Sequence, residues 1–189
     1  MEIEQRLTDV FARVAQELFS GTVYRVTSAN AEALAASMNG GRWSPPSNHE
    51  PGFPVLYTSL DQDGAIAEVA SYLSLLSPLP RKPLVVHAIR ITTSKTVTLE
   101  LSDLEEMGID PDLYSSRNYS RTQEIGAAAH FMGLDALITP SARWDCQNLT
   151  VFTNRHAMEE ELSVVSSEEF DWIERSIAIG LAPSPFETR

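Results

Sequence analysis

The stretch GGRWSPPSNHEPGFPVLYTSLDQDGAIAE, residues 40–68, contains the strongest local signals for the fold of this chain. It joins a glycine pair, an arginine next to a tryptophan, a proline-rich connector and a β-branched, aromatic run at 54–59. Paired glycines permit positive φ and close approach of the backbone to a ligand. The run at 54–59 predicts a strand, and Asp61 predicts the N-cap of a helix that reaches about residue 77. We therefore expect a loop, a strand and a helix to meet at a binding site.

Four side chains of this stretch supply the groups that hold a dinucleotide and split a glycosidic bond. Arg42 can clamp an anion, while Trp43 and Tyr57 offer flat stacking surfaces. Glu68, on the predicted helix, can face a developing positive charge. From the residues alone, other arrangements are commoner: Trp43 buried in the core, Arg42 as its solvated neighbour and Glu68 on an ordinary surface.

The N-terminal part predicts a helix followed by a strand. Apolar side chains recur at helical spacing over residues 2–19, which predicts an amphipathic helix that serves packing. Residues 22–26 are typical of a strand, and Arg25 lies inside it. From the sequence alone, a surface arginine whose tip reaches water is the commoner arrangement there. Residues 30–38 predict a short helix before the glycine pair.

The rest of the chain alternates strands and helices without a regular βαβ rhythm. Expected strands are 83–91, 97–101, 134–139, 149–152 and 162–165, and expected helices are about 121–132 and about 167–178. This pattern predicts one α+β domain over residues 1–189, with two small mixed β-sheets around a cleft and flanking helices. No Gly-x-Gly-x-x-Gly motif follows a predicted strand, which disfavours a Rossmann dehydrogenase. His87, inside the run at 83–91, is expected to be a structural histidine.

Composition restricts the possible partners. Twenty-six acidic against fourteen basic residues give a net charge of −12, which argues against direct binding of nucleic acid. The chain lacks an apolar run long enough for a membrane span and lacks a signal peptide, so we expect a cytoplasmic protein. Cys146 is the only cysteine, and the four histidines lack the short spacing of metal ligands. No metal site is expected.

Several short motifs, in a fixed order, resemble those of the RES domain family. They are Tyr24-Arg25, Gly41-Arg42-Trp43, Leu56-Tyr57-Thr58-Ser59, Ala67-Glu68, Gln123-x-x-Gly126, Pro140-Ser141 and Asn148-Leu149. Each motif is short, and their order and spacing over about residues 22–152 carry the resemblance. RES domains are the toxins of RES–Xre type II toxin–antitoxin systems. The resemblance implies a fold similar to ADP-ribosyltransferases and NAD+ as a consumed substrate.

The resemblance also implies roles for particular residues. Glu68 would be catalytic, assisted by Tyr57 and Arg42. The other binding residues implied are Arg25, Trp43, Ser141 and Asn148. In this scheme the two arginines hold the pyrophosphate and Tyr57 packs on nicotinamide or ribose. Ser141 and Asn148 donate hydrogen bonds that fix the nicotinamide amide or the ribose.

The expected function is a toxin that consumes NAD+ by cleaving the nicotinamide–ribose bond, through hydrolysis or phosphorolysis. One alternative is an ADP-ribosyltransferase that modifies a host protein. Another, from a different class, is a nucleotide-binding module without turnover. The resemblance further implies a cognate Xre-like helix-turn-helix antitoxin and a homodimer within a larger complex.

Overall fold

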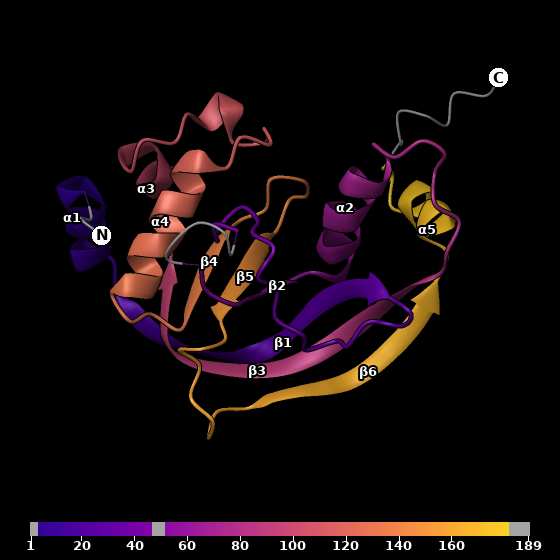
Figure 1. Ribbon diagram of the computed structural model, residues 1–189, viewed down its shortest axis with the longest axis horizontal. Coiled ribbons are helices and arrows are strands. Elements are labelled where there is room, and N and C mark those ends of the chain that lie inside the picture. Colours follow the sequence, from indigo (N-terminus) through magenta and orange to yellow (C-terminus); the bar gives the residue numbers. More distant parts are fainter. Residues whose placement is uncertain (1–3, 47–51, 182–189) are drawn as a thin grey trace.

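A six-stranded mixed sheet organises the molecule (Figure 1). The computed structural model describes residues 4–46 and 52–181. The strands are β1 (Gln16–Ser28), β2 (Val55–Ser59), β3 (Leu84–Thr98), β4 (Ala136–Pro140), β5 (Gln147–Phe152) and β6 (Leu162–Phe170). Their order is β1-β2-β5-β4-β3-β6, and β1 also pairs with β3, so five strands close into a barrel and β6 extends the sheet. The α+β class is confirmed, and the expectation of two small sheets is wrong.

The long antiparallel ladder between β1 and β3 is the physical reason for one closed sheet. It runs from Gln16 opposite Val97 to Ser28 opposite Leu84. Because β1 and β3 are long and twisted, β1 can also pair with the short strand β2, and β3 with the short strand β4. The other end of β3 pairs with β6, and fewer strand edges remain open. The closed part is filled by eight buried side chains: Val23, Leu56, Ile89, Ile91, Ala136, Ile138, Leu149 and Val151.

The described residues form five helices besides the sheet. They are α1 (Gln5–Arg13), α2 (Gln62–Leu73), α3 (Leu101–Glu106), α4 (Ser120–Phe131) and α5 (Trp172–Ala178), with a 3-10 turn, η1, at Pro111–Leu113. Helix α4 lies over β4 and β5 next to α1, whereas α2 and α5 lie together toward the other end of the long strands (Figure 1). In the described ranges, the structure has no helix with the length and apolar character needed to cross a membrane.

Two predicted helices are shorter than expected because strand pairing takes their ends. The helix expected at 2–19 is α1, which ends at Arg13, because β1 already begins at Gln16. Residues 2 and 3 of the expected helix lie outside the described residues. The helix expected at 167–178 begins at Trp172, because 166–170 pair with β3 as part of β6. In both places non-local pairing outweighs local helix propensity.

In three other segments the predicted secondary structure can be compared with the observed one. Residues 30–38 form turns and a bridge between Ser37 and Val55, not a helix. The strands expected at 83–91 and 97–101 are one continuous strand, β3, which ends at Thr98. The N-cap prediction is confirmed, since the Asp61 side chain accepts a hydrogen bond of 2.8 Å from the backbone N of Gly64.

Candidate active site

A cavity of about 430 Å³ lies between α2, the first two strands, the glycine pair and the segment before α4. This volume falls in the range of small-molecule sites. Four arginines line it: Arg25, Arg42, Arg117 and Arg143. Among the described residues around it, Glu68 is the only carboxylate. In a chain with a net charge of −12, this local excess of positive charge favours an anionic ligand.

The carboxylate of Glu68 is held by two hydrogen bonds to one of its oxygens. Ser141 Oγ and Asn148 Nδ2 each donate to Oε1, at 2.8 Å. Glu68 comes from α2, whereas Ser141 follows β4 and Asn148 is the second residue of β5. The antiparallel β4–β5 ladder brings Ser141 and Asn148 together. Within the described residues no hydrogen bond reaches Oε2. The carboxylate is therefore fixed in orientation with one oxygen available to a ligand.

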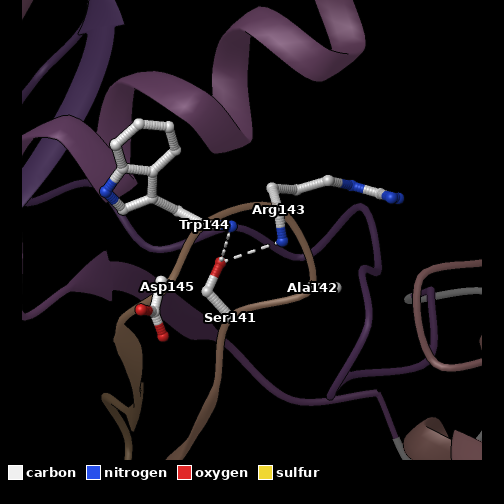
Figure 2. A pocket seen from close by; sticks show the side chains of 5 residues that line it. All are labelled: Ser141, Ala142, Arg143, Trp144 and Asp145. Atoms are coloured by element: carbon white, nitrogen blue, oxygen red, sulfur yellow. Dashed lines mark hydrogen bonds between the residues drawn. The ribbon is translucent and has the colours of Figure 1, made fainter. Parts of the chain in front are cut away.

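Ser141 is oriented by the turn that it begins (Figure 2). Its Oγ accepts hydrogen bonds from the backbone N of Arg143, at 3.1 Å, and of Trp144, at 3.2 Å, while it donates to Glu68. The hydroxyl is thus fully engaged and cannot rotate away from the carboxylate without losing these bonds. The turn, residues 141–145, also forms a second, shallow cavity.

Tyr57 and the glycine pair pack tightly at one wall. The Tyr57 hydroxyl accepts a hydrogen bond of 3.2 Å from the backbone N of Trp43, and burial raises the pKa of Tyr57, which keeps the hydroxyl protonated. A Cβ on Gly41 would lie 2.6 Å from this hydroxyl, and Gly40 has φ of +80°. The positive φ is therefore confirmed at Gly40. At Gly41 the close approach is to the Tyr57 hydroxyl, and an approach of this backbone to a ligand stays a prediction.

Trp43 does not present its ring as a stacking surface. Its side chain is 2% exposed and packs in the core with Phe53, Phe152 and Ile125. Only a small part of the residue can therefore face the cavity that it lines. The expectation of an indole platform at this position is corrected: the ring anchors the glycine loop to the core.

Arg42 organises the segment that precedes α4. Its Nη1 donates to the carbonyl of Tyr114 at 2.8 Å, and its Nη2 donates to that of Ser116 at 3.3 Å. The guanidinium lies over the rings of Tyr114 and Tyr119, at 5.0 and 4.8 Å from their centroids. Burial lowers the pKa of Arg42, but an arginine remains charged at neutral pH. From the sequence, Arg42 was expected either to clamp an anion or to be a solvated neighbour of Trp43. Its contacts with Tyr114, Ser116 and Tyr119 were not predicted.

Two buried polar atoms at the cavity lack a partner within the described residues: Nη1 of Arg25, a donor, and Oδ1 of Asn148, an acceptor. An unpaired buried polar group costs about 1–3 kcal/mol, so such atoms mark places where a ligand can complete the hydrogen bonding. Arg25 and Asn148 are both residues that the sequence had placed at the site. The Nη1 of Arg25 could donate to an acceptor atom of a ligand, and the Oδ1 of Asn148 could accept from a donor atom of a ligand.

His87 stands opposite Arg25 on β3, outside the chemistry of the site. Its ring nitrogens bond the hydroxyls of Thr27, at 2.9 Å, and Ser167, at 2.7 Å. Burial first, and then the charge of Arg25, lower the pKa of His87, so the ring is neutral near Arg25 at pH 7. The prediction of a structural histidine is confirmed.

Helix α4 fixes the glycine loop through the Gln123-x-x-Gly126 motif. Gln123 Nε2 donates to the carbonyl of Gly41 at 2.9 Å, and a Cβ on Gly126 would collide with the carbonyl of Trp43. The motif was part of the sequence pattern, but its contact with the loop was not predicted.

Sequence reasoning missed Arg117 and Arg143. Neither lies in a motif, and nothing in the sequence distinguishes them from other surface arginines. Their place at the cavity depends on contacts between distant segments. As for metals, the described ranges contain no group of three or more His, Cys, Asp or Glu side chains placed to hold an ion.

Known proteins resemble this chain in sequence and in fold. The RES domain model matches residues 22–173. The chain is 30% identical over 133 residues to the NAD(+) phosphorylase MbcT of Mycobacterium tuberculosis and to that of Mycobacterium bovis, covering 66% of this chain and 69% of each relative. A crystal structure of the M. tuberculosis MbcT–MbcA toxin–antitoxin complex matches with a TM-score of 0.75 and 23% identity, over 93% of this chain and 98% of that one. This chain therefore belongs to the RES domain family.

Proposed function

We propose that this protein is a toxin that consumes NAD+ by cleaving the bond between nicotinamide and ribose, with inorganic phosphate as the acceptor. The observation that carries the proposal is the carboxylate of Glu68, fixed by Ser141 and Asn148 inside a cavity lined by arginines. The name of the 30% identical relative, an NAD(+) phosphorylase, supports phosphate over a protein acceptor. A fold relationship to ADP-ribosyltransferases stays a prediction.

Cleavage of this bond passes through a state in which the ribose resembles an oxocarbenium ion. A fixed carboxylate beside the ribose stabilises the developing positive charge and can accept a hydrogen bond from the 2-hydroxyl. Glu68 Oε2 is suited to this task, because the hydrogen bonds from Ser141 and Asn148 use Oε1. The carboxylate is then preorganised and needs no rearrangement as charge develops.

The remaining groups match the other parts of NAD+. Arg25 offers its unpaired Nη1 to an oxygen of the diphosphate, which neutralises charge and completes the hydrogen bonding of a buried group. Asn148 offers its unpaired Oδ1 to an N–H or O–H of the substrate. The ring of Tyr57, packed against the glycine loop, forms a wall that excludes water from the ribose.

The protein also requires a partner that silences it, and we propose an antitoxin of the Xre-like, helix-turn-helix type. The solved structure with the same fold is a toxin–antitoxin complex, which supports such a partner. A carboxylate or chain end of the antitoxin placed beside Arg25 and Arg42 would block the place of the diphosphate. With a net charge of −12, the toxin would leave any DNA binding to the antitoxin.

The test is to incubate the purified chain with NAD+, with and without phosphate, and to resolve the products by mass, alone and in complex with its antitoxin. We expect free nicotinamide and a phosphorylated ADP-ribose in the presence of phosphate, and no turnover by the complex. Intact NAD+ after incubation with the free chain would refute the enzymatic proposal. A complex that turns over NAD+ as fast as the free chain would exclude occlusion.

Arg25→Ala should weaken NAD+ binding about tenfold or more, because a charge-assisted hydrogen bond contributes about 1.5–3 kcal/mol. Affinity is measured by calorimetry in a Glu68→Gln background, so that the substrate is not consumed during titration. Arg90→Ala is the matched control, since Arg90 is exposed on β3 and does not line the cavity. Equal affinity in the Arg25 and Arg90 variants would remove Arg25 from the binding site.

A further inference from the structure

The positive charge around the cavity exceeds what NAD+ can neutralise. Four arginines and one carboxylate line it. The dinucleotide carries one negative charge on each of its two phosphates and one positive charge on nicotinamide. Its binding leaves the cavity with surplus positive charge, which favours a second anion beside the first.

Arg117 and Arg143 supply this surplus. Arg143 Nη1 donates to the carbonyl of Ser115 at 2.6 Å, and Arg117 Nη2 donates to that of Ser71 at 2.7 Å. Within the described residues neither forms an ion pair, although Arg121, in the same acidic chain, pairs with Glu4 at 2.6 Å. A guanidinium has five N–H donors, so each arginine keeps donors free for the oxygens of a phosphate.

Arg143 is also tied to the catalytic carboxylate. Its backbone N donates to Ser141 Oγ, which in turn donates to Glu68. Among the described residues it is the one that lines both the main cavity and the shallow cavity of the turn 141–145. Figure 2 shows its side chain extending from the turn on the side opposite Asp145, so the carboxylate of Asp145 does not stand beside the guanidinium.

We propose that Arg143, with Arg117, binds the inorganic phosphate that accepts the ADP-ribosyl group, an inference that rests on the proposed function. An oxygen of hydrogen phosphate forms the new bond to the ribose C1 while the bond from C1 to the nicotinamide nitrogen breaks. The electron pair of that bond leaves with nicotinamide, which becomes neutral. The proton stays on the transferred phosphate, so charge and atoms balance.

The test is the rate of NAD+ loss at increasing phosphate concentrations, with products resolved by mass, for wild type, Arg143→Ala, Arg143→Gln and the control Arg90→Ala. Glutamine keeps an N–H donor for the Ser115 carbonyl but removes the charge. We expect the KM for phosphate to rise about tenfold or more in both Arg143 variants, as for the loss of a charge-assisted hydrogen bond, and to stay unchanged in the control.

The outcomes separate this inference from the proposed function. If wild type leaves NAD+ intact, the proposed function fails. If wild type consumes NAD+ without any dependence on phosphate, NAD+ cleavage stands and the phosphate site is excluded. If Arg143→Gln has a normal KM for phosphate while Arg143→Ala does not, the arginine acts through the carbonyl of Ser115, and the phosphate site is again excluded.

Discussion

Replacing Glu68 with glutamine is expected to lower the rate of NAD+ loss at least a hundredfold, with little change in folding stability. The loss follows from the removal of a fixed negative charge at the point where positive charge develops, a contribution of about 3–4 kcal/mol in comparable sites. Stability should be retained, because the amide oxygen of glutamine can still accept from Ser141 and Asn148. The measurements are kcat and KM by nicotinamide release, and the thermal midpoint.

Glu169→Gln is the matched control for this change. Glu169 is an exposed residue of β6 that does not line the cavity, and its substitution removes the same charge from the surface. We expect wild-type kcat in the control. A Glu68→Gln protein that keeps more than about a tenth of the wild-type rate, far above the losses typical of such groups, would show that the carboxylate is not the catalytic group.

Gly126→Ala is expected to destabilise the protein by about 3 kcal/mol and to disable the site at the same time. A Cβ at this position would collide with the backbone carbonyl of Trp43, so α4 or the glycine loop must move. Overpacking typically costs about 1–3 kcal/mol, and a backbone obstacle cannot swing aside as a flexible side chain can. In a chain of this length, the thermal midpoint should fall by about 6–12 °C.

The functional part of this prediction comes from the loop that α4 holds. The carbonyl of Gly41 accepts a hydrogen bond from Gln123 of α4, and Gly41 lies against Tyr57 at the cavity wall. A displaced loop therefore changes the shape of the site. Glu124→Ala is the control, because Glu124 is exposed on the same helix and its ion pair with Arg121 contributes less than about 1 kcal/mol. A Gly126→Ala protein with the wild-type midpoint and wild-type NAD+ turnover would contradict the close packing.

The sequence by itself determined the elements whose signals are local. The cap at Asp61 and the strand at 54–59 lie where the residue types place them, because a capping side chain and a β-branched run act over a few residues. The α+β class followed from the irregular alternation of such elements. The residues proposed for the site came from the ordered motifs, and the structure brings Glu68, Ser141 and Asn148 into contact.

Only the tertiary structure decided how these elements meet. Glu68 is 73 residues from Ser141 and 80 from Asn148, and their contact depends on the β4–β5 ladder and on α2, which no local signal places. The single closed sheet and the early start of β1 result from pairing with β3, far along the chain. Arg117 and Arg143 reach the cavity in the same way. Non-local pairing and packing contribute more free energy than local propensity, and a single sequence does not state which distant segments will pair.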